Sequence, residues 1–188
     1  LDSVLKRVER LTQIQPDSEV HVETIGFIES AITPLWKTIK ARIEKISSSD
    51  RQSILPVSER CLSPSDFGFH NALRQSDGSL RYVDFEYAGW DDPAKTLIDF
   101  TNQPDRLLPE SLAALFLEKT IPLFRNPNAL HRRLALLTPL YQIKWACICL
   151  NAFFPHRPLD PTHPLPLQLS RAKVMASRAI NEIAKTPH

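Results

Sequence analysis

Glycine is scarce in this sequence, which has only four glycines among 188 residues. They stand far apart, at Gly26, Gly68, Gly78 and Gly89. Loops that cradle the phosphates of a nucleotide or a dinucleotide place several glycines within a few residues. The sequence therefore excludes both a Walker-type loop and a dinucleotide-binding loop.

Cysteine is almost as rare, and the three cysteines form neither a CxxC pair nor a disulfide framework. Cys147 and Cys149 lie in an apolar stretch, which predicts that they are buried free thiols. A sparse and odd-numbered set of cysteines suits a reducing compartment. We therefore expect a cytoplasmic protein.

Long apolar runs and clusters of one charge are also missing. No stretch of about 18 apolar residues occurs, and there is no signal-peptide pattern. The 23 basic and 21 acidic residues give a net charge of +2 without a basic run. We therefore expect neither a membrane nor a nucleic acid as a partner. Because the first residue is Leu1, we expect the sequence to be part of a longer parent chain.

Helical periodicity runs through most of the sequence. Apolar residues recur at helical spacing near the start, and again from about 28 to 46, with Pro34 near the first turn of that second helix. The polar run Ser47–Asp50 ends it. Four further helices are predicted at about 94–101, 110–124, 128–153 and 166–185. The expected fold class is mainly α with a small β-hairpin.

The hairpin is predicted between Cys61 and Trp90, where Asp77-Gly78 indicates a two-residue turn of type I′. In that register Asn71 lies directly opposite Asp84, with Cα atoms about 4.5–5.5 Å apart. Both side chains then leave the same face of the hairpin. The same face carries two further predicted pairs, Leu73 with Tyr82 and Gln75 with Leu80.

Three polar residues near the hairpin form a candidate site. An amide oxygen from Asn71 and a carboxylate from Asp84 suit Mg²⁺, which is often held by one or two protein groups plus substrate phosphates. Asp66 stands five residues before Asn71, in an irregular loop that leads into the hairpin. A carboxylate there can accept a hydroxyl proton beside the metal. The set fits a base and a metal site, with phosphate as the transferred group.

Each of these residues also has an ordinary structural interpretation. An Asp and an Asn at this spacing occur often by chance. Asp84 alone could cap nearby backbone amides, and Asn71 alone could begin a strand or a turn. The combination of the loop, the spacing, the Asp-Gly hairpin and the following Asp-Phe pair favours the phosphotransfer site.

The segment Asp66-Phe-Gly-Phe-His-Asn71 resembles the catalytic loop of the aminoglycoside phosphotransferase and choline kinase-like family, which is related to protein kinases. The segment Asp84-Phe-Glu-Tyr-Ala-Gly-Trp-Asp-Asp-Pro93 is similar to the metal-binding segment of that family. The resemblance covers about residues 62–100 and extends more loosely over the flanking helices.

The resemblance implies the large, C-terminal lobe of a protein-kinase-like α+β fold, with the small lobe absent. Residues 1–188 would form one domain. Its parts would be leading helices (1–60), the catalytic loop and metal-binding hairpin (61–92) and a helical acceptor-side subdomain (93–188). Nothing before residue 62 resembles the β-rich small lobe, so the missing N-terminal lobe of the parent chain is an expected partner. We expect the fragment alone to turn over little or no ATP.

The resemblance also assigns roles by position. Asp66 would be the catalytic base toward the hydroxyl of a small-molecule acceptor. Asn71 and Asp84 would hold Mg²⁺ on the phosphates of ATP, the co-substrate. Asp91 and Asp92 are expected to begin the next helix, where acidic side chains favour the helix dipole.

The sequence departs from the family pattern at three positions. Pro64 stands where the family usually has a histidine, two residues before the catalytic Asp. His70 replaces a frequent glycine and is expected to be structural. Thr96 falls where many members have a second Asp, for which Asp99 could substitute. Phe85 is expected to pack beneath the site.

In this family the C-terminal helices also form the acceptor pocket. The candidates to line it are Trp145, Tyr141, Asn151 and the His156–His163 connection, with core packing as the alternative for the aromatic residues. Aminoglycosides are polycations and favour acidic pockets, whereas these helices carry many basic residues, among them Arg125, Arg132, Arg133 and Lys144. This argues against an antibiotic and leaves a sugar, an amino alcohol or another small hydroxyl compound as the substrate.

Two other classes of function stay open. The first is a non-catalytic binding or regulatory module, or a degenerate kinase. The second is a metal-dependent phosphohydrolase that uses the same carboxylates and transfers the phosphate to water.

Overall fold

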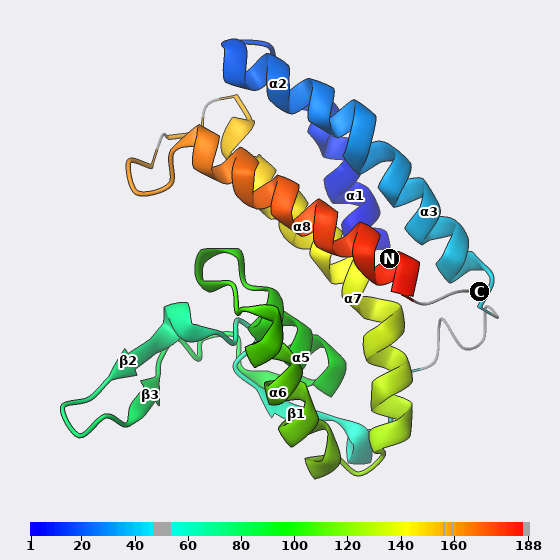
Figure 1. Ribbon diagram of the computed structural model, residues 1–188, viewed down its shortest axis with the longest axis vertical. Helices are drawn as coiled ribbons and strands as arrows, with labels where there is room; N and C mark the ends of the chain where they lie inside the picture. Colours follow the sequence, from blue (N-terminus) through cyan, green and yellow to red (C-terminus); the bar gives the residue numbers. More distant parts are fainter. Residues whose placement is uncertain (47–53, 156, 159, 186–188) are drawn as a thin grey trace. The chain divides into compact units, whose positions relative to one another are not determined.

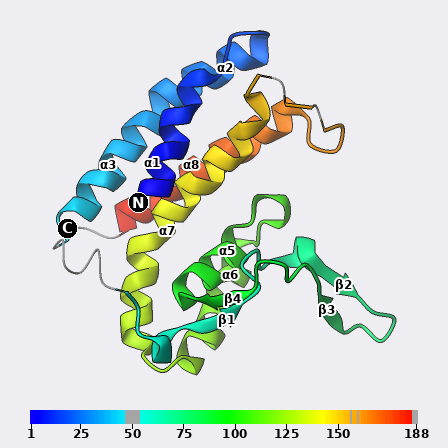
Figure 2. The same ribbon diagram turned by 180° about the vertical axis from the view of Figure 1, so that it is seen from behind.

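The computed structural model describes residues 1–46, 54–155, 157–158 and 160–185. The chain divides into two compact units (Figures 1 and 2). The first unit combines the two ends of the chain, Leu1–Arg51 and Thr138–His188, and the second is the middle, Gln52–Leu137. No helix in the described ranges has both the length and the apolar character that a membrane span requires.

The first unit is a bundle of helices (Figure 1). Its α-helices are α1 (Asp2–Arg10), α2 (Glu19–Phe27), α3 (Thr33–Glu44), the part of α7 (Pro127–Leu150) from Thr138 onward, and α8 (Leu165–Lys185). Short 3-10 turns follow α1 and α7, at Leu11–Gln13 and Asn151–Phe153, and a π-helical turn, Ile28–Ile32, joins α2 to α3. α8 packs against both α2 and α3.

The core of this unit is apolar and close to fully buried. Its largest buried apolar side chains lie in α3, α7, α8 and the short turns that adjoin the helices, and are Leu11, Ile32, Ile39, Ile143, Leu150, Phe153 and Met175. Cys147 and Cys149 are buried free thiols, as predicted. Burial raises the pKa of Cys147 to about 12, because the thiolate would lose its hydration.

Most helices lie where periodicity predicts them, with one clear exception. The predicted helix at 28–46 begins earlier, because α2 starts at Glu19 and runs almost without interruption into α3. The apolar pattern does not predict α2, because this helix contains Gly26 and a mixed order of polar and apolar residues. Pro34 lies in the first turn of α3, as predicted. The predicted break at Ser47–Asp50 lies outside the described residues.

In the described ranges, the strands all belong to the second unit, which also contains α-helices. β1 (Cys61–Ser63) pairs antiparallel with β4 (Gly89–Asp91), and β2 (Ala72–Arg74) pairs antiparallel with β3 (Leu80–Tyr82). The helices are α5 (Pro93–Asn102), α6 (Glu110–Thr120) and the first part of α7, with 3-10 turns at Val57–Glu59, Phe69–Asn71, Pro104–Arg106 and Ile121–Leu123. The mainly helical fold with a small hairpin is therefore confirmed, while the kinase-like lobe stays a prediction.

The β2–β3 hairpin is present, but its register differs by one residue from the predicted register. Ala72 lies opposite Tyr82, and Val83 N donates to the carbonyl of Asn71 over 2.9 Å. Asn71 is therefore opposite Val83, and the predicted direct pair of Asn71 and Asp84 is wrong. The other two predicted pairs, Leu73 with Tyr82 and Gln75 with Leu80, are wrong for the same reason.

The turn explains the shift, since it contains three residues where two were predicted. Gln75 N donates to Ser79 O (2.8 Å), and Gly78 N donates to Gln75 O (3.0 Å). Gly78 takes a left-handed φ of 84°, as expected for a type I turn closed by a left-handed residue. The Asp77 carboxylate accepts from Ser79 N (2.9 Å) and Ser79 Oγ (2.7 Å), which holds Asp77 within the turn.

α5 forms the centre of the second unit, because every residue of this helix except Lys95 is buried. Asp92 caps its N-terminus by accepting from Ala94 N (2.9 Å), and Pro93 occupies its first position. The prediction that Asp91 and Asp92 begin this helix is confirmed for Asp92 and wrong for Asp91, which is the last residue of β4. The hairpin, by contrast, projects away from the helices of the unit (Figures 1 and 2).

Candidate functional site

The loop that carries Asp66 lies between β1 and the 3-10 turn Phe69–Asn71. The Asn71 side chain reaches back to it, and Asn71 Nδ2 donates to the backbone carbonyl of Asp66 over 3.0 Å. This bond closes the loop and gives the five-residue spacing a structural purpose. It also leaves the amide oxygen of Asn71 as the group that can accept a ligand. The carboxylate of Asp66 is about half exposed, with 49% of the side chain accessible.

Asp84 follows directly after Val83, the residue opposite Asn71. Its backbone has a left-handed φ of 65°, a conformation that few residues other than glycine adopt. A residue in this conformation leaves the alternation of a regular strand, so the rule that predicted a shared face does not apply to Asp84. The Asp84 side chain is exposed, and within the described part of the chain its carboxylate has no hydrogen bond or ion pair.

His70 lies against the candidate base, a contact that sequence reasoning missed. His70 Nε2 is 3.2 Å from Asp66 Oδ2, close enough for an ion pair when the ring is protonated. The approach lacks hydrogen-bond geometry, and neither ring nitrogen has a hydrogen-bond partner within the described ranges. The ring also covers Gly68, where an added Cβ would stand only 2.7 Å from His70 Nδ1. A side chain at position 68 would therefore force the His70 ring to move.

Lys95 connects the loop to α5, and this contact was not predicted either. Its Nζ donates to the carbonyl of Ser65 over 3.1 Å and pairs with Asp91 Oδ2 (2.9 Å) and Asp99 Oδ2 (3.2 Å). Asp99, the possible substitute for the second Asp of the family, is thus linked to the loop through Lys95. Thr96 is turned elsewhere, toward the Asp92 carbonyl (3.4 Å).

Aromatic rings connect the Asp66 loop to α5. Phe67 stacks on Phe100 of α5 with ring centroids 4.7 Å apart, and it contacts Tyr82 of the hairpin at 5.0 Å. Phe100 also packs against Phe116 of α6 at 4.3 Å. The predicted supporting residue, Phe85, is 53% exposed, so that prediction is wrong. Phe67 takes this place because its loop passes directly over α5.

The donor chemistry of Asn71 and Asp84 fits Mg²⁺. Amide and carboxylate oxygens are hard ligands, and the amide oxygen is available because the Asn71 nitrogen is engaged by the loop. Asp84 contributes a carboxylate that no side chain in the described part of the chain neutralises. Within the described ranges, no group of three or more His, Cys, Asp or Glu side chains is placed to bind a metal ion. A site of this type would thus depend on substrate phosphates for its remaining ligands.

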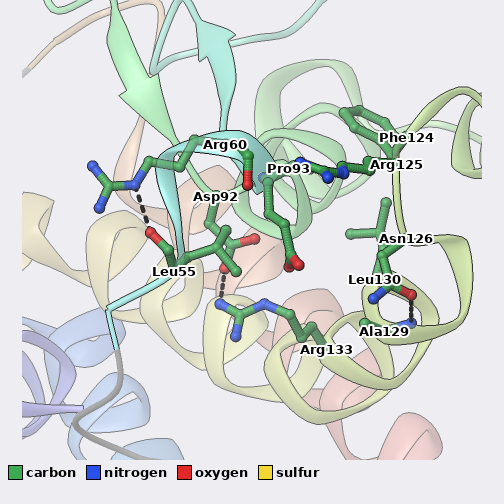
Figure 3. A pocket seen from close by; sticks show the side chains of 12 residues that line it. Leu55, Arg60, Asp92, Pro93, Phe124, Arg125, Asn126, Ala129, Leu130 and Arg133 are labelled. Atoms are coloured by element: carbon green, nitrogen blue, oxygen red, sulfur yellow. Dashed lines mark hydrogen bonds and ion pairs between the residues drawn. The ribbon is translucent and has the colours of Figure 1, made fainter.

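A pocket elsewhere in the second unit is unrelated to these residues. Its lining includes Arg60, Arg125 and Arg133 together with Asp92, and none of the predicted site residues (Figure 3). Arg133 pairs with the Asp92 carboxylate, and Arg60 Nε donates to the Leu55 carbonyl over 2.8 Å. Since Asp92 caps α5 and the Arg60 bond lies within the segment that precedes β1, we assign the pocket a structural role.

The predicted acceptor-pocket residues all belong to the first unit. Lys144 Nζ lies over the rings of Tyr141 (4.5 Å) and Trp145 (4.9 Å), and Asn151 Oδ1 accepts from Arg10 (3.1 Å). His156 lies outside the described residues.

At the other end of that connection, His163 Nδ1 contacts Asp160 Oδ2 at 2.7 Å. Hydrogen bonds from Thr162 and His163 lower the pKa of Asp160 to about 2. These contacts show a loop held by its own side chains, and none of them tests the acceptor role.

No family model matches this chain, and a search of curated proteins finds no matching sequence.

Proposed function

We propose that this protein is an ATP- and Mg²⁺-dependent phosphotransferase that moves the γ-phosphate to a hydroxyl group of a small molecule. The observation that carries the proposal is the bond from Asn71 Nδ2 to the Asp66 carbonyl. It joins the proposed base and a proposed metal ligand in one closed loop. The two left-handed residues other than glycine within the described ranges, Ser65 and Asp84, lie at this same site. Such strained positions cluster at functional sites.

In the proposed reaction, Asp66 accepts the proton of the acceptor hydroxyl. The hydroxyl oxygen bonds to the γ-phosphorus as the bond to the bridging oxygen breaks, and ADP leaves. The exposed carboxylate of Asp66 can meet a substrate from solvent, while Asn71 and Phe67 hold its loop from within. Catalysis would then depend on positioning and on charge neutralisation.

Asn71 and Asp84 are the residues that would hold Mg²⁺, which would supply neutralisation of phosphate charge. The closed loop presents the Asn71 oxygen, and the left-handed turn at Val83–Asp84 presents the carboxylate. Both residues adjoin the same hairpin, which keeps their backbones near each other despite the shifted register.

In this proposal, the groups that bind the phosphates of the nucleotide lie elsewhere in the parent protein. The sequence has no glycine-rich phosphate loop. We place the missing small lobe in the parent chain and the activity in the cytoplasm, and we propose that residues 1–188 alone transfer little or no phosphate. A sugar or an amino alcohol is the proposed acceptor class.

The test is transfer of radiolabelled γ-phosphate from ATP by the full-length protein, with one sugar, one amino alcohol and one aminoglycoside as acceptors. Asp84→Ala should abolish Mg²⁺-dependent nucleotide binding and transfer. Glu118→Gln, an exposed carboxylate of α6, is the matched control and should behave as wild type. Nucleotide binding without transfer would identify a binding module or degenerate kinase. Phosphate release into water with no acceptor labelled would identify a hydrolase.

A further inference from the structure

Ser65, the residue before the proposed base, has a left-handed φ of 72°. Serine has a Cβ that crowds the backbone in this conformation, so the conformation persists only where neighbouring groups hold it. Both backbone polar groups of Ser65 are held in this way. Its N–H donates to Ser63 Oγ over 3.1 Å, and Ser63 is buried. Its carbonyl accepts from Lys95 Nζ over 3.1 Å.

The Lys95 ammonium is itself held by oxygen atoms from three residues. An ammonium has three N–H donors, and the nearest oxygens to this one are Asp91 Oδ2 at 2.9 Å, the Ser65 carbonyl at 3.1 Å and Asp99 Oδ2 at 3.2 Å, with Ser65 Oγ farther away at 3.5 Å. Asp99 is only 2% exposed, and Lys95 shows 20% of its side chain. Burial lowers the pKa of Lys95, but the hydrogen bond to Asp91 and the charges of Asp99 and Asp91 outweigh it and raise that pKa above its usual range. Lys95 is therefore charged at neutral pH.

The two peptide groups that flank the Asp66 Cα are thus each held by a side chain. Lys95 holds the carbonyl of the Ser65–Asp66 peptide, and Asn71 holds the carbonyl of the peptide that follows. Fixing both peptide planes fixes the direction in which the Asp66 side chain leaves the backbone. We propose that Lys95 is a positioning residue, which aims the Asp66 carboxylate without touching the substrate. This role rests on the proposed function of Asp66.

The test compares three forms of the full-length protein: wild type, Lys95→Met and Lys119→Met. Lys119 is an exposed lysine on α6 and serves as the matched control. Hydrogen exchange of the backbone amides should rise about 10-fold or more in the Asp66–Asn71 loop of Lys95→Met, and stay unchanged elsewhere. With active wild type, kcat should fall about 10- to 100-fold while KM for Mg·ATP is retained, because a misplaced group costs rate rather than binding.

Restoring the positive charge at position 95 distinguishes a positioning role from a merely structural one, with kcat as the measured quantity. Lys95→Cys treated with 2-bromoethylamine regains an ammonium on a side chain of similar length, and kcat should recover. Wild type receives the same treatment, because Cys61 is partly accessible. Unchanged exchange in the loop, exchange that rises equally throughout the protein, or unchanged kcat would each overturn the proposal. If wild type transfers no phosphate at all, the proposed phosphotransferase function fails, while the exchange measurement still decides whether Lys95 holds the loop.

Discussion

The two segments that carry the proposed site differ in how firmly the protein holds them. Each contains one left-handed residue other than glycine, Ser65 in the first and Asp84 in the second. Around Ser65, buried Ser63 and the Lys95 ammonium occupy the backbone groups, and Phe67 packs on α5. The residues from Val83 to Ala88 are all exposed.

This contrast matches a division of labour. A base of the proposed kind has to be aimed before the substrate arrives, and the contacts of the Asp66 loop with α5 would serve this purpose. A metal-binding segment can take its final order from the metal and the phosphates, since these supply ligands that the protein lacks. Strain at Asp84 would then be offset only when the ligands bind. Four comparisons test this contrast.

The largest effect is expected at Asp66, the proposed base. Asp66→Asn keeps the size of the side chain but removes its ability to accept a proton, so transfer by the full-length protein should fall about 10²- to 10⁴-fold. Initial rates at saturating Mg·ATP measure the loss. Glu118→Gln should keep its full rate, and an Asp66→Asn rate within about 3-fold of wild type would show that Asp66 is not the base.

The second prediction compares how much two segments contribute to stability: the Asp66 loop, which packs on α5, and the exposed segment from Val83 to Ala88. Phe100→Ala removes the ring on which Phe67 and Phe116 pack, and should lower the free energy of unfolding by about 3–5 kcal/mol. Phe85→Ala removes an exposed ring and should change it by less than about 0.5 kcal/mol. Urea unfolding followed by circular dichroism compares the two. Equal losses would mean that Phe85 is packed after all.

A smaller effect tests the hairpin that joins the segments. Gly78 has a φ of 84°, and nothing lies within 4 Å of an added Cβ, so Gly78→Ala suffers backbone strain alone. We expect a loss of about 1 kcal/mol in the free energy of unfolding. Gly89→Ala is the control, because Gly89 also has open space but no left-handed φ. A neutral Gly78→Ala would contradict the three-residue turn.

The smallest effect is a pH dependence due to Lys95. Its pKa is raised in the folded protein, so its contribution to stability is fully present below the ordinary lysine pKa of about 10.4. The contribution is lost as the pH rises through the higher folded value. The Tm of wild type should therefore fall more steeply above that pH than the Tm of Lys95→Met. Parallel curves would show that Lys95 is not held by Asp91 and Asp99 as described.

Sequence reasoning succeeded where one local signal dominates. Apolar periodicity located α5, α6 and α8, and Asp77-Gly78 located the hairpin. It failed where two local signals compete. The Asp77 side chain captures the Ser79 amide and adds a third residue to the turn, which no count of turn residues reveals.

The candidate site could be proposed from the sequence, but the contacts that hold its residues could not. The spacing of Asp66 and Asn71 is a property of one short segment, and the structure closes that loop with a hydrogen bond. Lys95 and Phe100 act on the loop from a helix some thirty residues later. Contacts of that kind depend on how α5 packs, so the pattern of the sequence does not show them. His70 offered one local signal, its spacing of four residues from Asp66.

The small β1–β4 sheet has a practical consequence for spectroscopy. Trp90 of β4 lies opposite Leu62 and is 65% exposed, whereas Trp36 is buried. An aqueous quencher such as acrylamide should therefore reach the Trp90 indole readily and leave the Trp36 emission almost intact. Trp90 also follows closely after the exposed segment from Val83 to Ala88, which contains Asp84. One of the three tryptophans of the protein thus reports on that segment, and replacing the part-buried Trp145 by phenylalanine would simplify the signal without an attached label.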